Sequence, residues 1–282
     1  MRAIRRSPRA RLQTRWLLCL VGGIGVACYL FPIYWMIASG FKTSAEIFAN
    51  PPTWVPQHPT LDSYYYAFVR ENILRYLRNS LIIAAPVTAL TLILGSMGAY
   101  AMSRIGTRIV DAALFIVLLL QVFPEVLLAT PMFSIFRALN ILNTFAAVIL
   151  ATTSQQLAFA LVILRPLFKQ LPIELEEASF VDGCTRFQAF WRIVLPLMRV
   201  ALIVVGTVTF VRAYGQFVYA LTFLSQQELQ PATVGIYSFV GAEYADWHKV
   251  MAFSSIFVLP ILVVFLLLQE KIVAGLTAGA LK

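Results

Sequence analysis

A group of polar side chains in apolar surroundings is the part of this sequence best suited to hold a small hydrophilic molecule. Its members are Glu125, Gln155, Gln156, Arg212, Tyr214, Gln216 and Tyr219. Carboxylate, amide, guanidinium and phenol groups exchange hydrogen bonds with a polyhydroxyl solute, and an aromatic face can stack on a sugar ring. Packed helices use the same groups for hydrogen bonds to one another. The sequence therefore predicts a solute pathway at these residues and leaves purely structural roles open.

Glu125 is the most informative of these residues because its neighbourhood is otherwise uncharged. It lies in the run from Ala112 to Phe136, which also contains Pro124 and Pro131 and therefore predicts a disturbed helix. An ionisable group is costly in hydrocarbon, so Glu125 should face a cavity or a partner. It could line a pathway, pair with a residue such as Arg212, or carry a proton, and the sequence does not choose among these roles.

A second candidate is the charged segment from Glu174 to Pro196, which lies between two long apolar runs. It predicts two short helices, because Asp182-Gly183 can end the first and cap the second and Pro196 can stop the second. A polar hairpin beside a membrane is suited to contact a partner. It could alternatively lie on the lipid as an amphipathic loop.

Catalytic and nucleotide-binding patterns are absent from the sequence. The histidines, His58 and His248, are isolated, and neither HExxH nor GxSxG occurs. The C-terminal GLTAGALK lacks the GK[ST] ending of a nucleotide-binding loop. We therefore expect no metal site, no catalytic residue and no ATP binding in this chain. The energy for any transport would come from an ion gradient or from another polypeptide.

The elements that must position these residues are membrane-spanning helices. Of the 282 residues, 60% are hydrophobic and 12% are charged, and the mean hydropathy is +0.80, values typical of an integral membrane protein. About 20 apolar residues cross the hydrocarbon layer as a helix. The sequence predicts an all-α protein with a single transmembrane domain over residues 1–282 and six spans, at about 16–40, 79–102, 111–134, 141–165, 199–224 and 249–269.

The distribution of Lys and Arg predicts the orientation of these spans, because both residues accumulate in cytoplasmic loops. They gather before the first span and after the second, fourth and sixth, at Arg104, Arg108, Arg165, Lys169, Arg186, Arg192, Arg199, Lys271 and Lys282. This asymmetry predicts a cytoplasmic location for the N-terminal segment 1–15, the loop 172–196 and the tail 270–282.

The charged segment also resembles a known family. It closely resembles the EAA loop of permease subunits of binding-protein-dependent ABC importers. The matching residues are Glu177-Ala178-Ser179, Asp182-Gly183, Phe190, Ile193 and Leu195-Pro196. FPIYWMIASGFKTSAEIF resembles the first span of that family, and DWHKVMAF together with QEKIVAGLTAGALK resembles its sixth span and tail. The resemblance covers nearly the whole chain. It points to the carbohydrate-uptake type, similar to the shorter maltose-transporter permease.

The resemblance implies the type I ABC importer permease fold, with the loop forming coupling helices that dock into a cleft on a cytoplasmic ATPase. The ATPase-coupling residues would be Glu177, Ala178, Ser179, Asp182, Gly183, Phe187 and Phe190. The implied partners are a second, related permease subunit, two ATPase subunits and an extracytoplasmic solute-binding protein, with a sugar or related polar solute as cargo. ATP and Mg would be held by the ATPase. The implied location is the cytoplasmic (inner) membrane of a bacterium or archaeon, with both termini cytoplasmic.

A different class of transporter also fits part of the pattern. In an ion-coupled secondary solute carrier, Glu125 would be the proton or sodium site. Such a carrier usually shows internal sequence repeats, and none is evident in this chain.

Overall fold

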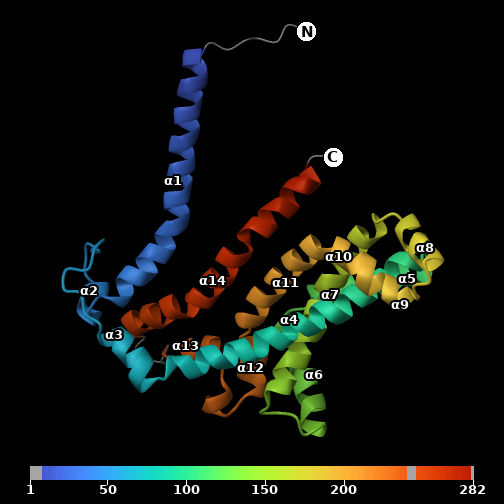
Figure 1. Ribbon diagram of the computed structural model, residues 1–282. Helices are drawn as coiled ribbons and strands as arrows, with labels where there is room; N and C mark the ends of the chain where they lie inside the picture. The colour runs from blue at the N-terminus through green and yellow to red at the C-terminus, as the bar shows by residue number, and fades with distance from the viewer. Residues whose placement is uncertain (1–7, 240–245, 281–282) are drawn as a thin grey trace. The chain divides into compact units, whose positions relative to one another are not determined.

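A computed structural model describes residues 8–239 and 246–280 of the protein, and the regular elements in these ranges are all helices (Figure 1). The all-α class predicted from the sequence is confirmed. The helices form two compact units, Met1–Glu71 with Phe239–Ile256 and Asn72–Ser238 with Phe257–Lys282. The expected cytoplasmic segments 1–15 and 270–282 lie partly outside the described residues.

The first unit is built on a close approach of two helices. A Cβ added at Gly40 would lie 3.0 Å from the Cα of Ala252, so only glycine lets the end of the first helix approach the last helix so closely. The helices of this unit are α1 (Pro8–Gly40), α2 (Ser44–Ile47), α3 (Asp62–Tyr65), a π-helix (Tyr66–Arg70) and the beginning of α14 (Trp247–Ala280).

The proline-rich connection after α1 is fixed by buried charges. The Lys42 ammonium, 2% exposed, donates a hydrogen bond to the Thr53 carbonyl at 2.5 Å. The Glu46 carboxylate accepts one from the Thr53 hydroxyl at 2.9 Å and one from the Gln57 N–H at 2.8 Å. The hydrogen bond from the Gln57 backbone holds the pKa of Glu46 below its ordinary value. The connection is therefore an ordered loop with its own polar core.

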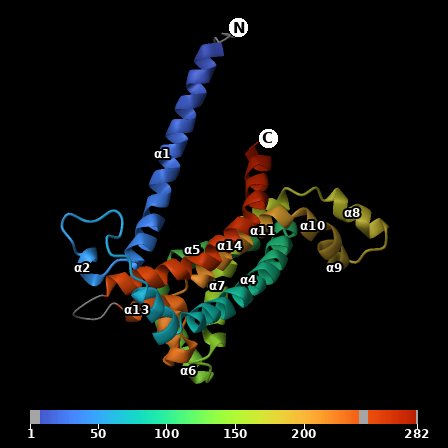
Figure 2. The same cartoon turned by 60° about the vertical axis from the view of Figure 1, so that its left-hand side comes forward.

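The second unit carries the candidate site residues, and its centre is the packing of α4 against α7 and α11 (Figures 1 and 2). A Cβ added at Gly95 of α4 would lie 2.8 Å from the Cβ of Ala160 of α7, so small residues allow the two backbones to approach closely. The elements of this unit are α4 (Ile73–Arg104), α5 (Arg108–Val122), α6 (Glu125–Ala138), α7 (Phe145–Lys169), α8 (Glu174–Val181), α9 (Arg186–Ala189), a π-helix (Phe190–Val194), α10 (Leu195–Leu197), α11 (Arg199–Tyr214), α12 (Val218–Phe223), a 3-10 helix (Gln227–Leu229), α13 (Ala232–Ser238) and the remainder of α14.

Among the described residues, four helices are long and apolar enough to cross a membrane: Leu17–Gly40, Ile73–Arg104, Phe145–Lys169 and Trp247–Glu270. A fifth candidate consists of Arg186–Leu197 and Arg199–Tyr214, which are bent by 79°. The span expected at 111–134 is two helices, α5 and α6, and the span expected at 199–224 is interrupted between α11 and α12. The count of six spans remains a prediction.

The expected hairpin is formed by α8 and α9, and its bend lies at Gly183. This residue has a φ of +85°, the left-handed conformation that glycine adopts without strain. The Gly183 N–H donates to the Phe180 carbonyl at 3.1 Å, and the Cys184 N–H donates to the Ser179 carbonyl at 2.9 Å. These are the two hydrogen bonds of a Schellman motif, which ends α8.

Two details of the hairpin correct the sequence prediction. Thr185, not Asp182, caps the second helix, because its hydroxyl accepts from the Gln188 N–H at 3.3 Å and the Gln188 side chain accepts from the Thr185 N–H at 2.8 Å. Pro196 lies within the helical stretch Arg186–Leu197 and does not end it. The chain bends after Leu197 instead.

Candidate functional site

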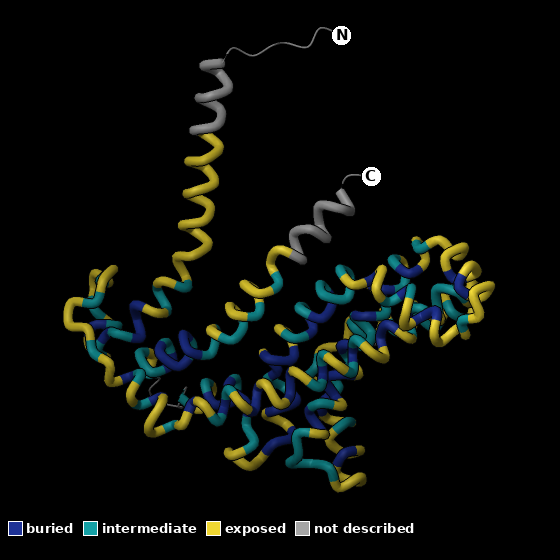
Figure 3. The backbone as a smooth tube through the Cα atoms, viewed as in Figure 1, coloured by how far each residue is buried: buried dark blue, intermediate teal, exposed yellow. Residues whose placement is uncertain are grey.

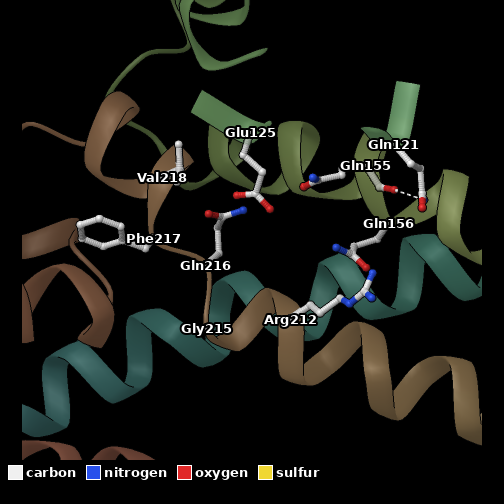
Figure 4. A pocket seen from close by; sticks show the side chains of 9 residues that line it. All are labelled: Gln121, Glu125, Gln155, Gln156, Arg212, Gly215, Gln216, Phe217 and Val218. Carbon is white, nitrogen blue, oxygen red and sulfur yellow. Dashed lines mark hydrogen bonds between the residues drawn. The ribbon is translucent and has the colours of Figure 1, made fainter. Parts of the chain in front are cut away.

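A polar cavity of about 420 Å³ lies where two interrupted helices end (Figure 4). One part of its wall is the junction of α5 and α6, another is the junction of α11 and α12, and a third is α7. The lining residues are Gln121, Glu125, Gln155, Gln156, Arg212, Gly215, Gln216, Phe217 and Val218. The cavity thus gathers polar side chains that are far apart in the sequence.

Both interruptions have identifiable causes. Pro124 precedes α6 with φ −58° and ψ 138°, which are not helical angles. At the end of α11, the carbonyl of Gln216 accepts a hydrogen bond from the Thr233 hydroxyl at 2.7 Å, and its side-chain oxygen accepts one from the Tyr219 N–H at 3.3 Å. Irregular backbone is tolerated at membrane depth where it is satisfied by protein groups or lines a cavity, and here both conditions are met.

The amides of α7 supply hydrogen-bonding groups to the cavity. The side chain of Gln121 donates to the backbone carbonyl of Gln155 at 3.5 Å, which links α5 to α7. The side-chain oxygens of Gln155 and Gln156 are buried and accept no hydrogen bond within the described part of the chain. A buried amide oxygen without a donor is unfavourable, so these atoms would be stabilised by a hydroxyl group that enters the cavity.

Opposite charges enter the cavity from different helices. Figure 4 shows the side chains of Glu125, from α6, and Arg212, from α11, both directed into it. Neither forms an ion pair with another described residue, so the pairing considered from the sequence is not present. The Arg212 guanidinium instead lies over the ring of Phe159, with 4.4 Å between its carbon and the ring centroid. Stacking of this kind orients the guanidinium plane and leaves its N–H edge free to donate.

The structure gathers five of the seven predicted pathway residues in this cavity and places two tyrosines elsewhere. Tyr214 is fully buried, stacks on Phe257 at 4.8 Å and donates its hydroxyl to the Phe257 carbonyl at 3.2 Å. Tyr219 is also fully buried and stacks on Phe223 at 5.7 Å. Both rings belong to the apolar core of the unit.

Sequence reasoning missed part of the cavity wall. Gln121 could have been found, because it is an amide in an apolar helix, as Glu125 is a carboxylate in one. Gly215, Phe217 and Val218 line the cavity only through the interruption of α11, and their residue types give no such signal. Within the described residues, no three His, Cys, Asp or Glu side chains form a group that could hold a metal ion.

The hairpin of α8 and α9 has an exposed and a buried face. Among the expected coupling residues, the exposed ones are Glu177, Ala178, Asp182, Gly183 and Phe187. Phe187 is 63% exposed, and its ring lies edge-on to that of Trp191 with 6.0 Å between the centroids. Ser179 and Phe190 are each 3% exposed and are therefore packed within this chain. The expected contact surface is thus divided, and five of its seven residues are accessible.

A residue that the sequence did not single out holds the buried face. Glu176 is 4% exposed and forms an ion pair with Arg104 of α4 at 2.5 Å. It lies three positions before Ser179 and hence on the same side of α8, whereas Glu177 lies on the other side. Adjacent acidic residues in α8 therefore face in different directions.

Comparison with known proteins gives these features a context. Residues 91–277 match the family described as "Binding-protein-dependent transport system inner membrane component". The chain is similar to the sulfoquinovosyl glycerol transport system permease SmoH of Agrobacterium fabrum (strain C58), with 36% identity over 253 residues that cover 90% of this chain and 89% of that protein. It is also similar to the trehalose/maltose transport system permease MalG of Thermococcus litoralis, with 35% identity over 270 residues that cover 94% and 96% of the two chains.

A solved structure shares the fold. A chain in the crystal structure of a bacterial ABC transporter involved in the import of the acidic polysaccharide alginate superposes with a TM-score of 0.76 at 19% identity, over 95% of this chain and 99% of that chain. The type I permease fold predicted from the sequence is confirmed. The match over residues 91–277 and the identity to full-length permeases show that the chain belongs to the inner membrane permease components of binding-protein-dependent ABC transport systems.

Proposed function

We propose that the protein is a permease subunit of an ATP-driven importer for a sugar or a related polar solute, which an external binding protein delivers. The observation that carries the choice of solute is the cavity lined by Gln121, Gln155, Gln156 and Gln216 with Glu125 and Arg212. Amides and charges with free donors and acceptors suit a molecule with many hydroxyl groups. The names of the similar permeases, for sulfoquinovosyl glycerol and for trehalose and maltose, support the same class.

The size of the cavity is consistent with this class of solute. Its volume of about 420 Å³ falls within the range of roughly 300–1,000 Å³ of small-molecule sites. Carboxylate and amide oxygens would accept hydrogen bonds from the hydroxyls of the solute, and Arg212 would donate to its oxygens. Interactions of modest strength suit a pathway, because the solute must enter and also leave.

The energy for transport would enter at the hairpin. We place one of the two ATPase subunits against its exposed face, with Glu177, Asp182 and Phe187 as contacts. Full burial of the Phe187 ring would contribute roughly 1.5–3 kcal/mol to docking. ATP and Mg would be held by the ATPase subunits.

The remaining partners would meet other surfaces of the chain. The most apolar window of the span Leu17–Gly40 has none of its residues buried, and Figure 3 shows α1 exposed along much of its length. Lipid and a second, related permease subunit would cover such a surface. The family description, an inner membrane component, supports a location of the chain in that membrane. We propose six spans with both termini in the cytoplasm, from the positions of Lys and Arg.

The transport cycle would follow alternating access. The loaded binding protein docks outside, ATP binding closes the ATPase pair and opens the permease pair outward, and hydrolysis resets the assembly. The family match favours this coupling over an ion-coupled carrier that uses Glu125.

Reconstitution tests the proposal. The chain is purified with its second permease and ATPase subunits and placed in liposomes, with the binding protein and a labelled saccharide outside and ATP inside. We expect uptake that requires both ATP and the binding protein and is insensitive to ionophores. Uptake by the chain alone, driven by a proton or sodium gradient, would refute the proposal.

A further inference from the structure

The cytoplasm-facing end of α4, in the proposed orientation, holds the hairpin through a buried carboxylate. Arg104 Nε and Nη2 donate to Glu176 Oε1 at 2.9 and 2.5 Å, and the Tyr100 hydroxyl donates to Glu176 Oε2 at 2.6 Å. Arg104 Nη2 also lies 3.5 Å from the carbonyl oxygen of Leu171, just before α8. Both oxygens of the carboxylate are therefore hydrogen-bonded, and all three donors belong to α4.

Tyr100 connects the same place to the apolar core. Its ring centroid lies 5.0 Å from that of Phe190, which begins the π-helix after α9, and 5.9 Å from that of Phe168, near the end of α7. Phe190 and Phe168 are nearly fully buried. The two arms of the hairpin, the end of α4 and the end of α7 thus meet around one side chain.

We propose that Glu176, Arg104 and Tyr100 form a clamp that passes movement of the hairpin to α4. The inference rests on the proposed function, because it needs a partner that moves the hairpin. The three side chains are positioning residues: they would touch neither the solute nor ATP. No exposed coupling residue is part of the clamp, so docking and transmission are assigned to different faces of α8.

The packing of α4 gives such a movement a route to the cavity. The close contact of Gly95 with Ala160 ties α4 to α7, so a displacement of α4 also displaces α7. Gln155 and Gln156 extend from α7 into the cavity. A shift at α8 would therefore reach the cavity wall through two packed helices.

The burial of this ion pair distinguishes it from a surface contact. The side chains of Arg104 and Glu176 are 18% and 6% exposed, whereas in the ion pair of Arg165 with Asp111 the Asp111 side chain is 64% exposed. A buried ion pair in which two guanidinium nitrogens donate to the carboxylate is screened little by solvent and resists a change of orientation. An exposed ion pair contributes little to stability. Loss of the Glu176 charge would leave Arg104 without its partner and free α8 to move without α4.

The test measures the number of solute molecules imported per ATP hydrolysed by the complete reconstituted importer. We expect Glu176→Ala to lower this ratio roughly 5- to 150-fold, the usual range for coupling between two sites. Glu176→Gln should give a smaller loss, since an amide oxygen still accepts from the Tyr100 hydroxyl. The matched control is Glu174→Gln, which changes an exposed acidic residue in the same turn and should leave the ratio unchanged.

A solely structural role would give a different result. It would reduce the amount of assembled importer and leave the ratio at the control value, and that outcome would overturn the clamp. Tyr100→Phe removes one hydrogen bond and keeps the ion pair, so it provides a second measurement if Glu176→Ala does not assemble; an unchanged ratio in this variant overturns the clamp as well. Failure of the unmodified importer to take up solute with ATP and binding protein would instead refute the proposed function.

Discussion

The Arg212 guanidinium is the cationic group of the cavity, and its position on the Phe159 ring leaves its donors free for solute. Removing a charged hydrogen-bond donor costs about 1.5–3 kcal/mol. We therefore expect Arg212→Ala to raise the KM for uptake roughly 10- to 100-fold. Arg137→Ala, at an exposed position of α6 outside the cavity, is the control. Unchanged uptake kinetics and solute preference in Arg212→Ala would return this residue to a structural role.

Glu46 predicts a pH dependence of the loop after α1. Hydrogen bonds in the folded loop depress its pKa below the ordinary 4.5, so its stabilising contribution is complete above that value and is lost as the pH falls through the lower, folded-state pKa. Limited digestion with pepsin should cut the loop faster at a pH below the folded-state pKa of Glu46 than at a pH near 4.5. The variant Glu46→Gln should already be cut quickly near pH 4.5. Equal, pH-independent cleavage of the two proteins would contradict this role.

At the scale of residues, the sequence indicates where polar chemistry occurs but not where side chains point. The sequence draws attention to Glu125, Gln155 and Arg212, because a polar group in an apolar membrane helix is energetically costly and therefore usually functional. Tyr214 looked equally suitable, and only the packing against α14 shows that it is a core residue. Likewise, α8 is too short for a readable period, so nothing in the sequence separates Glu176 from its neighbour.

At the scale of elements, the contact between α4 and α7 depends on the absence of a side chain at Gly95. A Cβ there would lie 2.8 Å from the Cβ of Ala160, so one of the backbones must shift. We expect Gly95→Ala to destabilise the protein by about 1–3 kcal/mol, the usual cost of overpacking. The Tm in detergent measures this effect. Gly23→Ala in α1, where the added atom meets nothing within 4 Å, is the control, and equal Tm values would show that the helices can separate without cost.

The elements themselves were partly predictable. Apolar runs located α1, α4, α7 and α14, because length and hydropathy suffice to identify a long membrane helix. Pro124 predicted a disturbed helix, and the helix is interrupted at this residue. The interruption between α11 and α12 has a weaker signal, the single glycine Gly215 at the end of α11. It is stabilised by the contact of Gln216 with Thr233, which is distant in the sequence.

At the scale of the whole molecule, we propose separate tasks for the two polar features of the chain. The cavity provides the groups that suit a polar solute, and the hairpin presents an exposed face that suits a partner. The family could be recognised from the sequence because the hairpin has a specific residue pattern. The cavity could not be assembled from the sequence, because it requires the relative positions of α5, α6, α7, α11 and α12.

The most direct test of the central claim is ATP-dependent uptake by the reconstituted importer carrying Glu177→Arg. Glu177 is exposed and its side chain forms no hydrogen bond or ion pair with another described residue, so reversal of its charge should act on a docked partner and not on the fold. Glu174→Arg, in the same turn, controls for the added charge. We predict that Glu177→Arg abolishes uptake and retention of the ATPase while the permease pair stays in the membrane. Uptake at the unmodified rate would contradict the assignment of the hairpin as the ATPase contact.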